Sequence, residues 1–173
     1  MSQPANSEGF GPLRGVRVLD LGTMIAAPYG ASMLADFGAE VIKVEMPGSG
    51  DPSRDLLPRV EGYSVRWGGF SRNKKCVTIN LKSPAGRDLF LDLVRRSDLI
   101  IENFRPGTLD RLGLDYETLK AANPGIIVVR ISGYGQSGPN RELAGFGTPA
   151  TAFSGVTYLT GYPDRPPVSP PIS

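Results

Sequence analysis

The sequence predicts an α/β protein with a Rossmann-like, doubly wound and mainly parallel sheet. One observation behind this prediction is a set of five short, β-branched apolar runs, the pattern of strands covered on both faces. The other is that segments of helical periodicity lie between those runs. Such alternation of strand and helix favours parallel strands joined by right-handed crossovers.

The apolar runs are the predicted strands. They occupy residues 16–21, 41–45, 77–81, 99–103 and 126–132. In a sheet of this kind, ligands bind outside the carboxyl ends of the strands. The segments expected at that edge are residues 22–28, 46–51, 103–105 and 133–139.

The first predicted helix begins at Pro28 and ends at Gly38, because glycine is favoured just past a helix C-terminus. Its apolar residues recur at helical spacing and predict one buried face, made of Tyr29, Met33, Leu34 and Phe37.

Two further helices follow the third and fourth strands. Ser83 is the predicted N-cap of the second helix and Pro84 its first residue. The side that this helix buries is predicted to carry Leu89, Phe90, Leu93 and Val94. The third helix is predicted over residues 115–122, with Asp115 as its N-cap and an Asn-Pro pair at its end.

Glycine and proline divide the chain. They number 22 and 16 of its 173 residues, and they gather in two loop-rich inserts, at residues 46–72 and 133–150, and in residues 163–173. The last of these segments has too many prolines for a helix or a central strand. We therefore expect a flexible N-terminus (1–11), one α/β domain (12–162) and a proline-rich segment (163–173).

The residue counts exclude several kinds of site. With one cysteine, Cys76, and no histidine, the chain cannot supply a zinc site, a Ser-His-Asp triad or a Cys-His dyad. The 19 basic and 17 acidic residues are too balanced for a nucleic-acid-binding protein recognised by bulk charge. Since no leader pattern and no apolar run of spanning length is present, we expect no membrane partner and a cytoplasmic location.

A dinucleotide site is disfavoured. Glu45 ends the second predicted strand, where a ribose-binding acid would lie. The first turn, however, reads GTMIAAP in place of G-x-G-x-x-G, so its backbone cannot approach a pyrophosphate in the usual way.

Four segments in order carry a family resemblance. They are residues 12–51 (from PLRGVRVLDLG to VIKVEMPGSGD), 73–87 (NKKCVTINLKSPAGR), 102–119 (ENFRPGTLDRLGLDYETL) and 133–139 (GYGQSGP). Together they closely resemble the N-terminal portion of the class III CoA-transferases, also known as the formyl-CoA transferase, carnitine CoA-transferase and bile-acid-inducible family.

The resemblance implies a fold and a reaction. The fold is the N-terminal part of a Rossmann-like large domain, in a homodimer of interlocked subunits. The reaction moves CoA from an acyl-CoA to a free carboxylic acid through an aspartyl-CoA thioester. In the family pattern the nucleophilic aspartate falls about three residues beyond Ser173, so the chain is expected to hold no catalytic residue and to be inactive by itself. Asp164 lies in a turn signal, GYPDRPP, and is not assigned that role.

The resemblance also implies which residues bind coenzyme A or acyl-CoA, the substrate, with no permanent cofactor and no metal. They are Ile25, Ala26, Ile79, Asn80, Leu81, Lys82, Asn103, Phe104, Arg105, Arg111, Ala144, Gly145, Phe146 and Gly147. Among them, the lysine and the two arginines suit phosphate groups, and the segment around Lys82 matches the family stretch that lines the adenosine end.

Some positions depart from the family pattern or stay open. Met46 stands where several relatives have an arginine, so one phosphate contact is missing or comes from Arg54. Gly147 replaces a more usual aspartate. Lys74 and Lys75 either add positive charge for phosphates or belong to a solvated loop.

Two other functions are weighed. The racemase branch of the same family inverts 2-methylacyl-CoA esters with a histidine in a G-H-G-Q element, and this chain has Tyr134 at that position, a weak base near neutral pH. The second alternative is a non-catalytic CoA-binding fragment or a split-gene subunit, because the expected nucleophile is missing from the chain.

Overall fold

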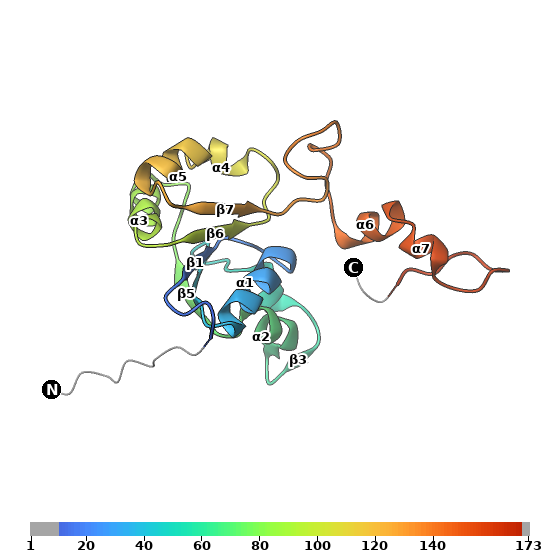
Figure 1. The fold of residues 1–173 in the computed structure, drawn as a ribbon. Helices are drawn as coiled ribbons and strands as arrows, with labels where there is room; N and C mark the ends of the chain where they lie inside the picture. Colours follow the sequence, from blue (N-terminus) through green and yellow to red (C-terminus); the bar gives the residue numbers. More distant parts are fainter. Residues whose placement is uncertain (1–10, 171–173) are drawn as a thin grey trace. The chain divides into compact units, whose positions relative to one another are not determined.

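The computed structural model describes residues 11–170, which form two compact units that divide after Ile131 (Figure 1). The division falls inside the range 12–162 that the sequence assigns to one domain. Apart from Gly11, the expected flexible N-terminus lies outside the described residues.

The first unit is built on a five-stranded sheet. In chain order its strands are β1 (Arg17–Asp20), β2 (Glu40–Glu45), β5 (Lys74–Thr78), β6 (Leu99–Glu102) and β7 (Ile127–Arg130). Their order in the sheet is β5-β2-β1-β6-β7, and every pair is parallel. The chain thus builds outward from β1 in one direction and then in the other, which confirms the doubly wound prediction (Figure 1).

The third strand lies earlier than the sequence predicts. β5 covers Lys74–Thr78, whereas the apolar run suggests residues 77–81. Ile79 and Leu81 are buried, but they reach the core from the loop that follows the strand. Because β5 is an edge strand with mostly exposed residues, the apolar run marks the buried loop and the strand precedes it.

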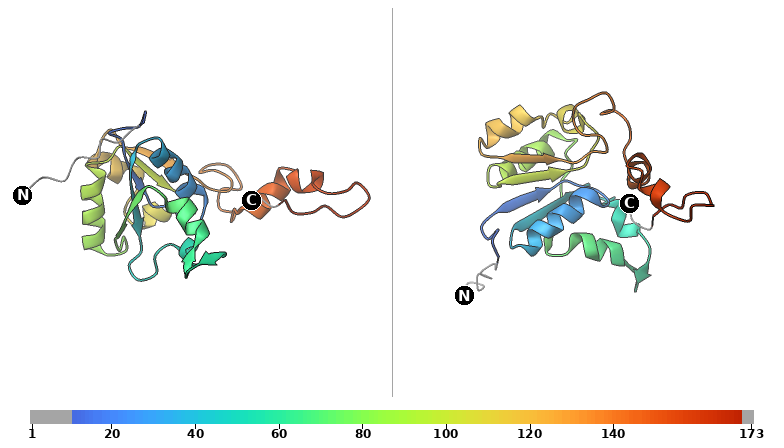
Figure 2. Two further views of the ribbon diagram at one scale, coloured as in Figure 1. Left: turned by 90° about the horizontal axis from the view of Figure 1, so that it is seen from below. Right: turned by 45° about the vertical axis from the view of Figure 1, so that its right-hand side comes forward.

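Helices cover both faces of the sheet. Along β1, Leu19 packs in a cluster with residues of α3 (Pro84–Val94) and α5 (Tyr116–Ala122), while Val18 packs in a cluster with α1 (Ala26–Asp36). Alternate residues of a strand point to opposite faces, so the two clusters lie on opposite sides of the sheet. Figure 2 shows the sheet between these layers.

The buried face of α1 differs from the predicted one. Ala27, Ala31 and Ala35 pack on the sheet, whereas Tyr29, Met33 and Phe37 are 47%, 45% and 53% exposed and Leu34 is half-buried. Small side chains let the helix backbone lie close to the strands, and this turns the larger residues outward. The end of the helix is as predicted, since Gly38 follows with φ of +100°.

The caps of the other two helices are as predicted. Ser83 Oγ accepts from the Gly86 N–H at 3.1 Å, and Asp115 accepts from the Thr118 N–H at 3.0 Å. In α3, Phe90 and Val94 are fully buried, Leu93 packs against them and Leu89 is 53% exposed, so part of the predicted face is solvated.

The first loop-rich insert contains short elements. These are the 3₁₀ turn η1 (Pro52–Asp55), the hairpin of β3 (Arg59–Val60) and β4 (Tyr63–Ser64), and α2 (Val65–Ser71). The insert is tied to α1, because Ser32 Oγ donates to the Phe70 carbonyl at 2.6 Å.

The second unit, described over residues 132–170, holds α6 (Gly147–Phe153) and α7 (Val156–Leu159). The backbones of Gly133 and Gly145 are in contact, since a Cβ on Gly133 would lie 2.4 Å from the Gly145 Cα. Only glycine permits this approach. Tyr134 packs edge-on against Phe153, with ring centroids 6.0 Å apart.

Candidate functional site

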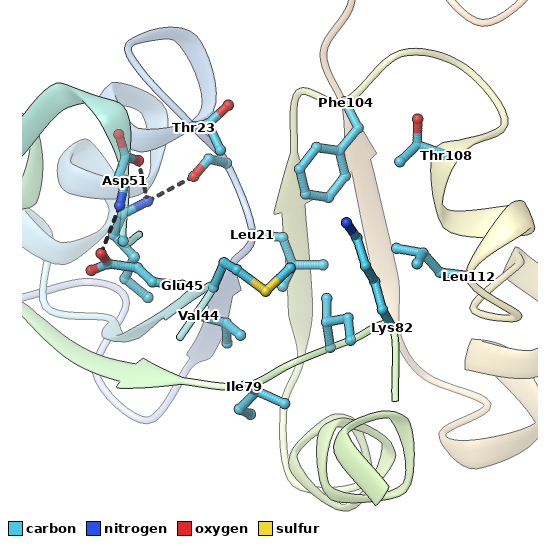
Figure 3. Close-up of a pocket in the computed structure, with 15 residues that line it drawn as sticks. Leu21, Thr23, Val44, Glu45, Asp51, Ile79, Lys82, Phe104, Thr108 and Leu112 are labelled. Atoms are coloured by element: carbon cyan, nitrogen blue, oxygen red, sulfur yellow. Dashed lines mark hydrogen bonds and ion pairs between the residues drawn. The ribbon is translucent and has the colours of Figure 1, made fainter. Parts of the chain in front are cut away.

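A cavity of about 250 Å³ opens at the carboxyl edge of the sheet. Its walls come from the segments that follow β1, β2, β5 and β6, with two residues in or next to α4 (Thr108–Arg111). The lining residues are Leu21, Gly22, Thr23, Lys43, Val44, Glu45, Met46, Gly50, Asp51, Ile79, Leu81, Lys82, Phe104, Thr108 and Leu112 (Figure 3). The cavity therefore lies where a doubly wound sheet binds its ligands.

Four of the predicted binding residues meet in this cavity. They are Ile79, Leu81, Lys82 and Phe104. Lys82 is exposed, and Figure 3 shows its side chain extending from the loop after β5 toward Phe104. The cavity thus joins apolar walls to a cationic rim.

Asn80, also predicted, shapes the loop that carries Lys82. Its Oδ1 accepts from the Lys82 N–H at 3.0 Å, and its carbonyl accepts from the N–H and the hydroxyl of Ser83 at 3.1 and 3.0 Å. This side-chain turn leads the chain directly into the N-cap of α3. Asn80 itself does not line the cavity.

Asn103 bridges the ends of two neighbouring strands. Its Oδ1 accepts from the Thr23 N–H at 2.8 Å, and its Nδ2 donates to the Thr23 carbonyl at 2.9 Å. Both polar groups of this carboxamide are therefore used to hold the turn after β1, which is a different use from the predicted ligand contact.

The rest of that turn is held by buried charges. Asp20 Oδ1 accepts from the Gly22 N–H at 2.9 Å, and the Lys43 ammonium donates to the Gly22 carbonyl at 2.7 Å. Asp51 Oδ1 accepts from the Met24 N–H at 3.2 Å. Including the two Asn103 contacts, side chains bind five backbone N–H and C=O groups of the turn, which belong to Gly22, Thr23 and Met24.

The charged residues of this network are almost fully buried. The Lys43 ammonium lies 2.9 Å from Asp51 Oδ2 and 3.7 Å from Asp20 Oδ2. Lys74 pairs with the same Asp20 oxygen at 2.8 Å and donates to the Pro28 carbonyl at 2.6 Å. The side chains of all four charged residues are at most 1% exposed.

The pKa values of two residues in this network, Asp51 and Lys74, lie below their usual values. Burial raises the pKa of the Asp51 carboxyl, but the hydrogen bonds from Ser53 and Lys43 outweigh it and leave the pKa below its usual value. Burial lowers the pKa of Lys74, and the charge of Asp20 offsets only part of this. Lys74 is therefore a buried structural cation, and it does not line the cavity.

Glu45 is fully engaged by protein groups. Arg54 Nη2 and Nε lie 2.7 and 2.9 Å from its two oxygens, and the Asp51 N–H donates to Oε2 at 2.9 Å. Burial opposes ionisation of Glu45, but these contacts hold the pKa of its carboxyl below the usual value. A carboxylate used in this way does not offer a free site for ribose hydroxyls, which agrees with the weak case for a dinucleotide.

Arg54 is held on two sides. Its guanidinium pairs with Glu45 and stacks on Trp67 of α2, 3.8 Å from the ring centroid. It does not line this cavity, but it lines a neighbouring one of about 640 Å³ together with Met46 and Glu45. That Arg54 supplies the phosphate contact that Met46 lacks stays a prediction.

The two predicted arginines do not line the cavity, but each neighbours a residue that does: Arg105 follows Phe104 in the chain, and Arg111 contacts Thr108. Arg105 follows β6 and is exposed. Arg111 ends α4, and its Nη2 donates to Thr108 Oγ1 at 3.0 Å. Thr108 lines the cavity. Both guanidinium groups remain accessible to an anion at this edge.

Glu102 is buried at the end of β6. Its Oε2 accepts from the Phe104 N–H at 2.5 Å, and Arg130 Nε lies 3.9 Å from Oε1. Burial raises the pKa of the Glu102 carboxyl, and the contacts with Phe104 and Arg130 only partly oppose this.

The remaining predicted residues lie at the start of α1 or in the second unit. Ile25 is the N-cap of α1 and Ala26 its first residue, and neither lines the cavity. Residues 144–147 belong to the second unit, where Gly145 and Phe146 line a separate cavity of about 360 Å³ and Gly147 begins α6.

The buried charged residues are not among the site residues predicted from the sequence. Asp20 and Lys43 are register partners on neighbouring strands, each inside a run that was interpreted as apolar. A charged residue in a strand that is covered on both faces requires a buried partner, and that rule was the available signal. Asp51 gives no such signal, because it lies in a loop.

The part of the chain that the structure describes gives two further observations. No helix in it is long and apolar enough to cross a membrane. No group of three or more acidic or cysteine side chains in it is placed to hold a metal ion.

The chain is similar to known proteins over nearly its whole length. The sequence profile of CoA-transferase family III matches residues 13–173. The chain is 52% identical over 163 residues to the succinyl-CoA–D-citramalate CoA-transferase of Chloroflexus aurantiacus, a match covering 94% of this chain and 40% of the relative. It is 48% identical over 172 residues to the alpha subunit of a succinyl-CoA–L-malate CoA-transferase from Chloroflexus aurantiacus, with 98% and 40% covered.

A solved structure of a CAIB/BAIF family protein from Brucella suis is also similar. Its TM-score is 0.88 at 40% identity, covering 93% of this chain and 44% of that one. The chain spans about 40% of the length of the two curated relatives. With the profile matched over nearly its whole length, the chain belongs to CoA-transferase family III.

Proposed function

We propose that the chain is the N-terminal, CoA-binding part of an enzyme that moves CoA from an acyl-CoA to a free carboxylic acid. The observation that carries this proposal is the cavity at the carboxyl edge of the sheet, with apolar walls and a cationic rim. Coenzyme A has the matching chemistry, because it joins a flat base to several phosphate groups.

The base and the phosphates of the coenzyme would each contact residues of suitable chemistry. The base would pack among Ile79, Leu81 and Met46, which are apolar lining residues. Lys82 at the rim, with Arg105 and Arg111 beside it, would face the phosphates, since a lysine is a mobile point charge and a guanidinium binds phosphate in a bidentate manner.

The nucleophile would come from outside these residues. Two carboxylates line the cavity, and both have partners: Glu45 pairs with Arg54, and Asp51 pairs with Lys43. A nucleophilic carboxylate must be free to attack the thioester and then to carry CoA. We expect that aspartate beyond Ser173, and we expect the 173-residue chain to bind CoA without transferring it.

The relatives suggest which substrates to test. Both curated names given above pair succinyl-CoA with an acid, D-citramalate or L-malate. Succinyl-CoA is therefore the first donor, and these hydroxy diacids are the first acceptors.

The binding test is calorimetric titration of the chain with CoA. The expected result is saturable heat that weakens as the salt concentration rises, because part of the attraction is between exposed charges. Adenosine 3′,5′-bisphosphate should compete with CoA, and pantetheine should not. If CoA gives no saturable heat at low salt, the proposed function is wrong.

The transfer test separates an enzyme fragment from a free-standing transferase. The chain is mixed with succinyl-CoA and labelled D-citramalate or L-malate, and labelled acyl-CoA is measured. We expect none from the chain alone, and transfer from a longer chain that includes the expected aspartate. Turnover by the 173 residues would contradict the assignment of the nucleophile. A longer chain that binds CoA without transfer would favour a non-catalytic binding protein.

A further inference from the structure

The turn after β1 has a conformation that its own residues do not favour. Met24 has φ of +63°, in the left-handed region that residues other than glycine, asparagine and aspartate rarely adopt. Gly22 has no space for a side chain, since a Cβ there would lie 2.5 Å from the Ala27 Cβ. Something outside the turn must therefore hold it in this shape.

Two buried charged residues, Lys43 and Asp51, help to fix the turn in this conformation. Lys43 donates to the Gly22 carbonyl at 2.7 Å, and Asp51 accepts from the Met24 N–H at 3.2 Å. The two charges also pair with each other at 2.9 Å. The turn is thus held at both ends by one ion pair that comes from β2 and the loop after it.

The same groups face the cavity. Gly22 and Thr23 line it from the turn, and Lys43 and Asp51 line it from β2 and the loop after β2. Asp51 is itself fixed, because its Oδ1 accepts from the N–H and hydroxyl of Ser53 at 2.8 and 2.6 Å. A movement of the ion pair would therefore move a wall of the cavity.

We infer that Lys43 and Asp51 are positioning residues, which hold the Gly22–Met24 turn in the shape that receives the ligand of the cavity. The part of this inference that concerns CoA rests on the proposed function. The part that concerns the turn does not, because it is measured without ligand.

A purely structural role is the alternative. Removing one partner of a buried pair leaves an uncompensated charge and destabilises a fold strongly, whereas neutralising both partners is often tolerated. Single variants therefore cannot separate the two roles. The double variant Lys43→Met with Asp51→Asn can, because the asparagine still accepts a hydrogen bond from Met24 while the Gly22 carbonyl loses its donor.

The first measurement compares this double variant with the unchanged chain and with Lys120→Met, an exposed lysine on α5 that serves as the matched control. We expect the double variant to show a cooperative thermal transition and to bind CoA at least tenfold more weakly. The Lys120→Met control should have the same melting temperature and the same CoA affinity as the unchanged chain. A double variant with the same melting temperature and the same CoA affinity as the unchanged chain would overturn the inference.

The second measurement needs no CoA, and its first part uses only the unchanged chain. Amide hydrogen exchange of the unchanged chain should show Thr23 and Met24 protected relative to Gly48, an exposed loop residue. In the double variant the amides of the turn should exchange at least tenfold faster, while those of β6 keep their rates. If the Met24 amide, which donates to Asp51, exchanges as fast as that of Gly48 in the unchanged chain, the ion pair does not hold the turn. Protected amides without CoA binding would remove the proposed function and leave the positioning role in place.

Discussion

The carboxamide of Asn103 binds both backbone groups of Thr23, at 2.8 Å through Oδ1 and at 2.9 Å through Nδ2. The contact joins the end of β6 to the turn after β1, which are neighbours in the sheet. A side chain with one donor and one acceptor on the same planar group is needed for such a bridge. The two strand ends that border the cavity are therefore fixed to each other.

Asn103→Leu should weaken both the fold and the site. Leucine has the same branching and the same number of side-chain heavy atoms but leaves the Thr23 N–H and carbonyl without side-chain partners, so the free energy of unfolding should fall by about 1–3 kcal/mol. CoA affinity should fall as well, because Thr23 lines the cavity. Urea unfolding and calorimetry measure the two effects. Asn140→Leu, at an exposed position in the second unit, is the control. Equal unfolding midpoints for the two variants would contradict the bridge.

Lys82→Gln should reduce CoA affinity roughly tenfold, because a hydrogen bond to a charged group contributes about 1.5 kcal/mol. The melting temperature should stay unchanged, since the Lys82 side chain is exposed. The dependence of the affinity on salt should become weaker with one cation fewer. Titrations at two salt concentrations measure this. Lys120→Gln, which removes the same charge from α5, should leave affinity and salt dependence as they are.

Met46→Arg should tighten CoA binding. Met46 lines the cavity and is 36% exposed, and the family resemblance described above implies an arginine at this position in several relatives. A guanidinium there can reach a phosphate in a bidentate manner, and the expected gain is about five- to tenfold in affinity. Met33→Arg places the same charge on the exposed side of α1, away from the cavity, and controls for a general increase in positive charge. A similar gain in both variants would mean that the effect is not local.

The features of the fold that depend only on residues close in sequence were predicted correctly. Ser83 and Asp115 cap their helices as predicted, because a cap is decided by the residue and the next three positions. The parallel, doubly wound sheet was predicted from the alternation of strands and helices. The buried face of α1 was missed because helical periodicity gives weight to large apolar residues, and here alanines pack on the sheet.

The site was predicted only in part for a related reason. Lys82 and Phe104 were found through the family resemblance and do line the cavity. Asn103 was found too, but as a ligand contact, since its pairing with Thr23 joins residues 80 positions apart. The contacts of Lys43 with Gly22 and of Asp51 with Met24 also join residues 21 and 27 positions apart, and periodicity and spacing do not contain such contacts.

Glu102→Gln should stabilise the chain more at pH 7 than at pH 4. Burial raises the pKa of Glu102 above its ordinary value of 4.5, so the folded chain keeps this proton where the unfolded chain loses it. As pH rises through 4.5 toward the raised pKa, the unfolded state therefore binds fewer protons than the folded state, and this group lowers the free energy of unfolding. Glutamine cannot ionise, yet its oxygen can still accept from the Phe104 N–H. Urea unfolding at the two pH values measures the difference, with the exposed Glu117→Gln as control. A stabilisation that is larger at pH 4 would show that Arg130 and Phe104, and not burial, govern this carboxyl.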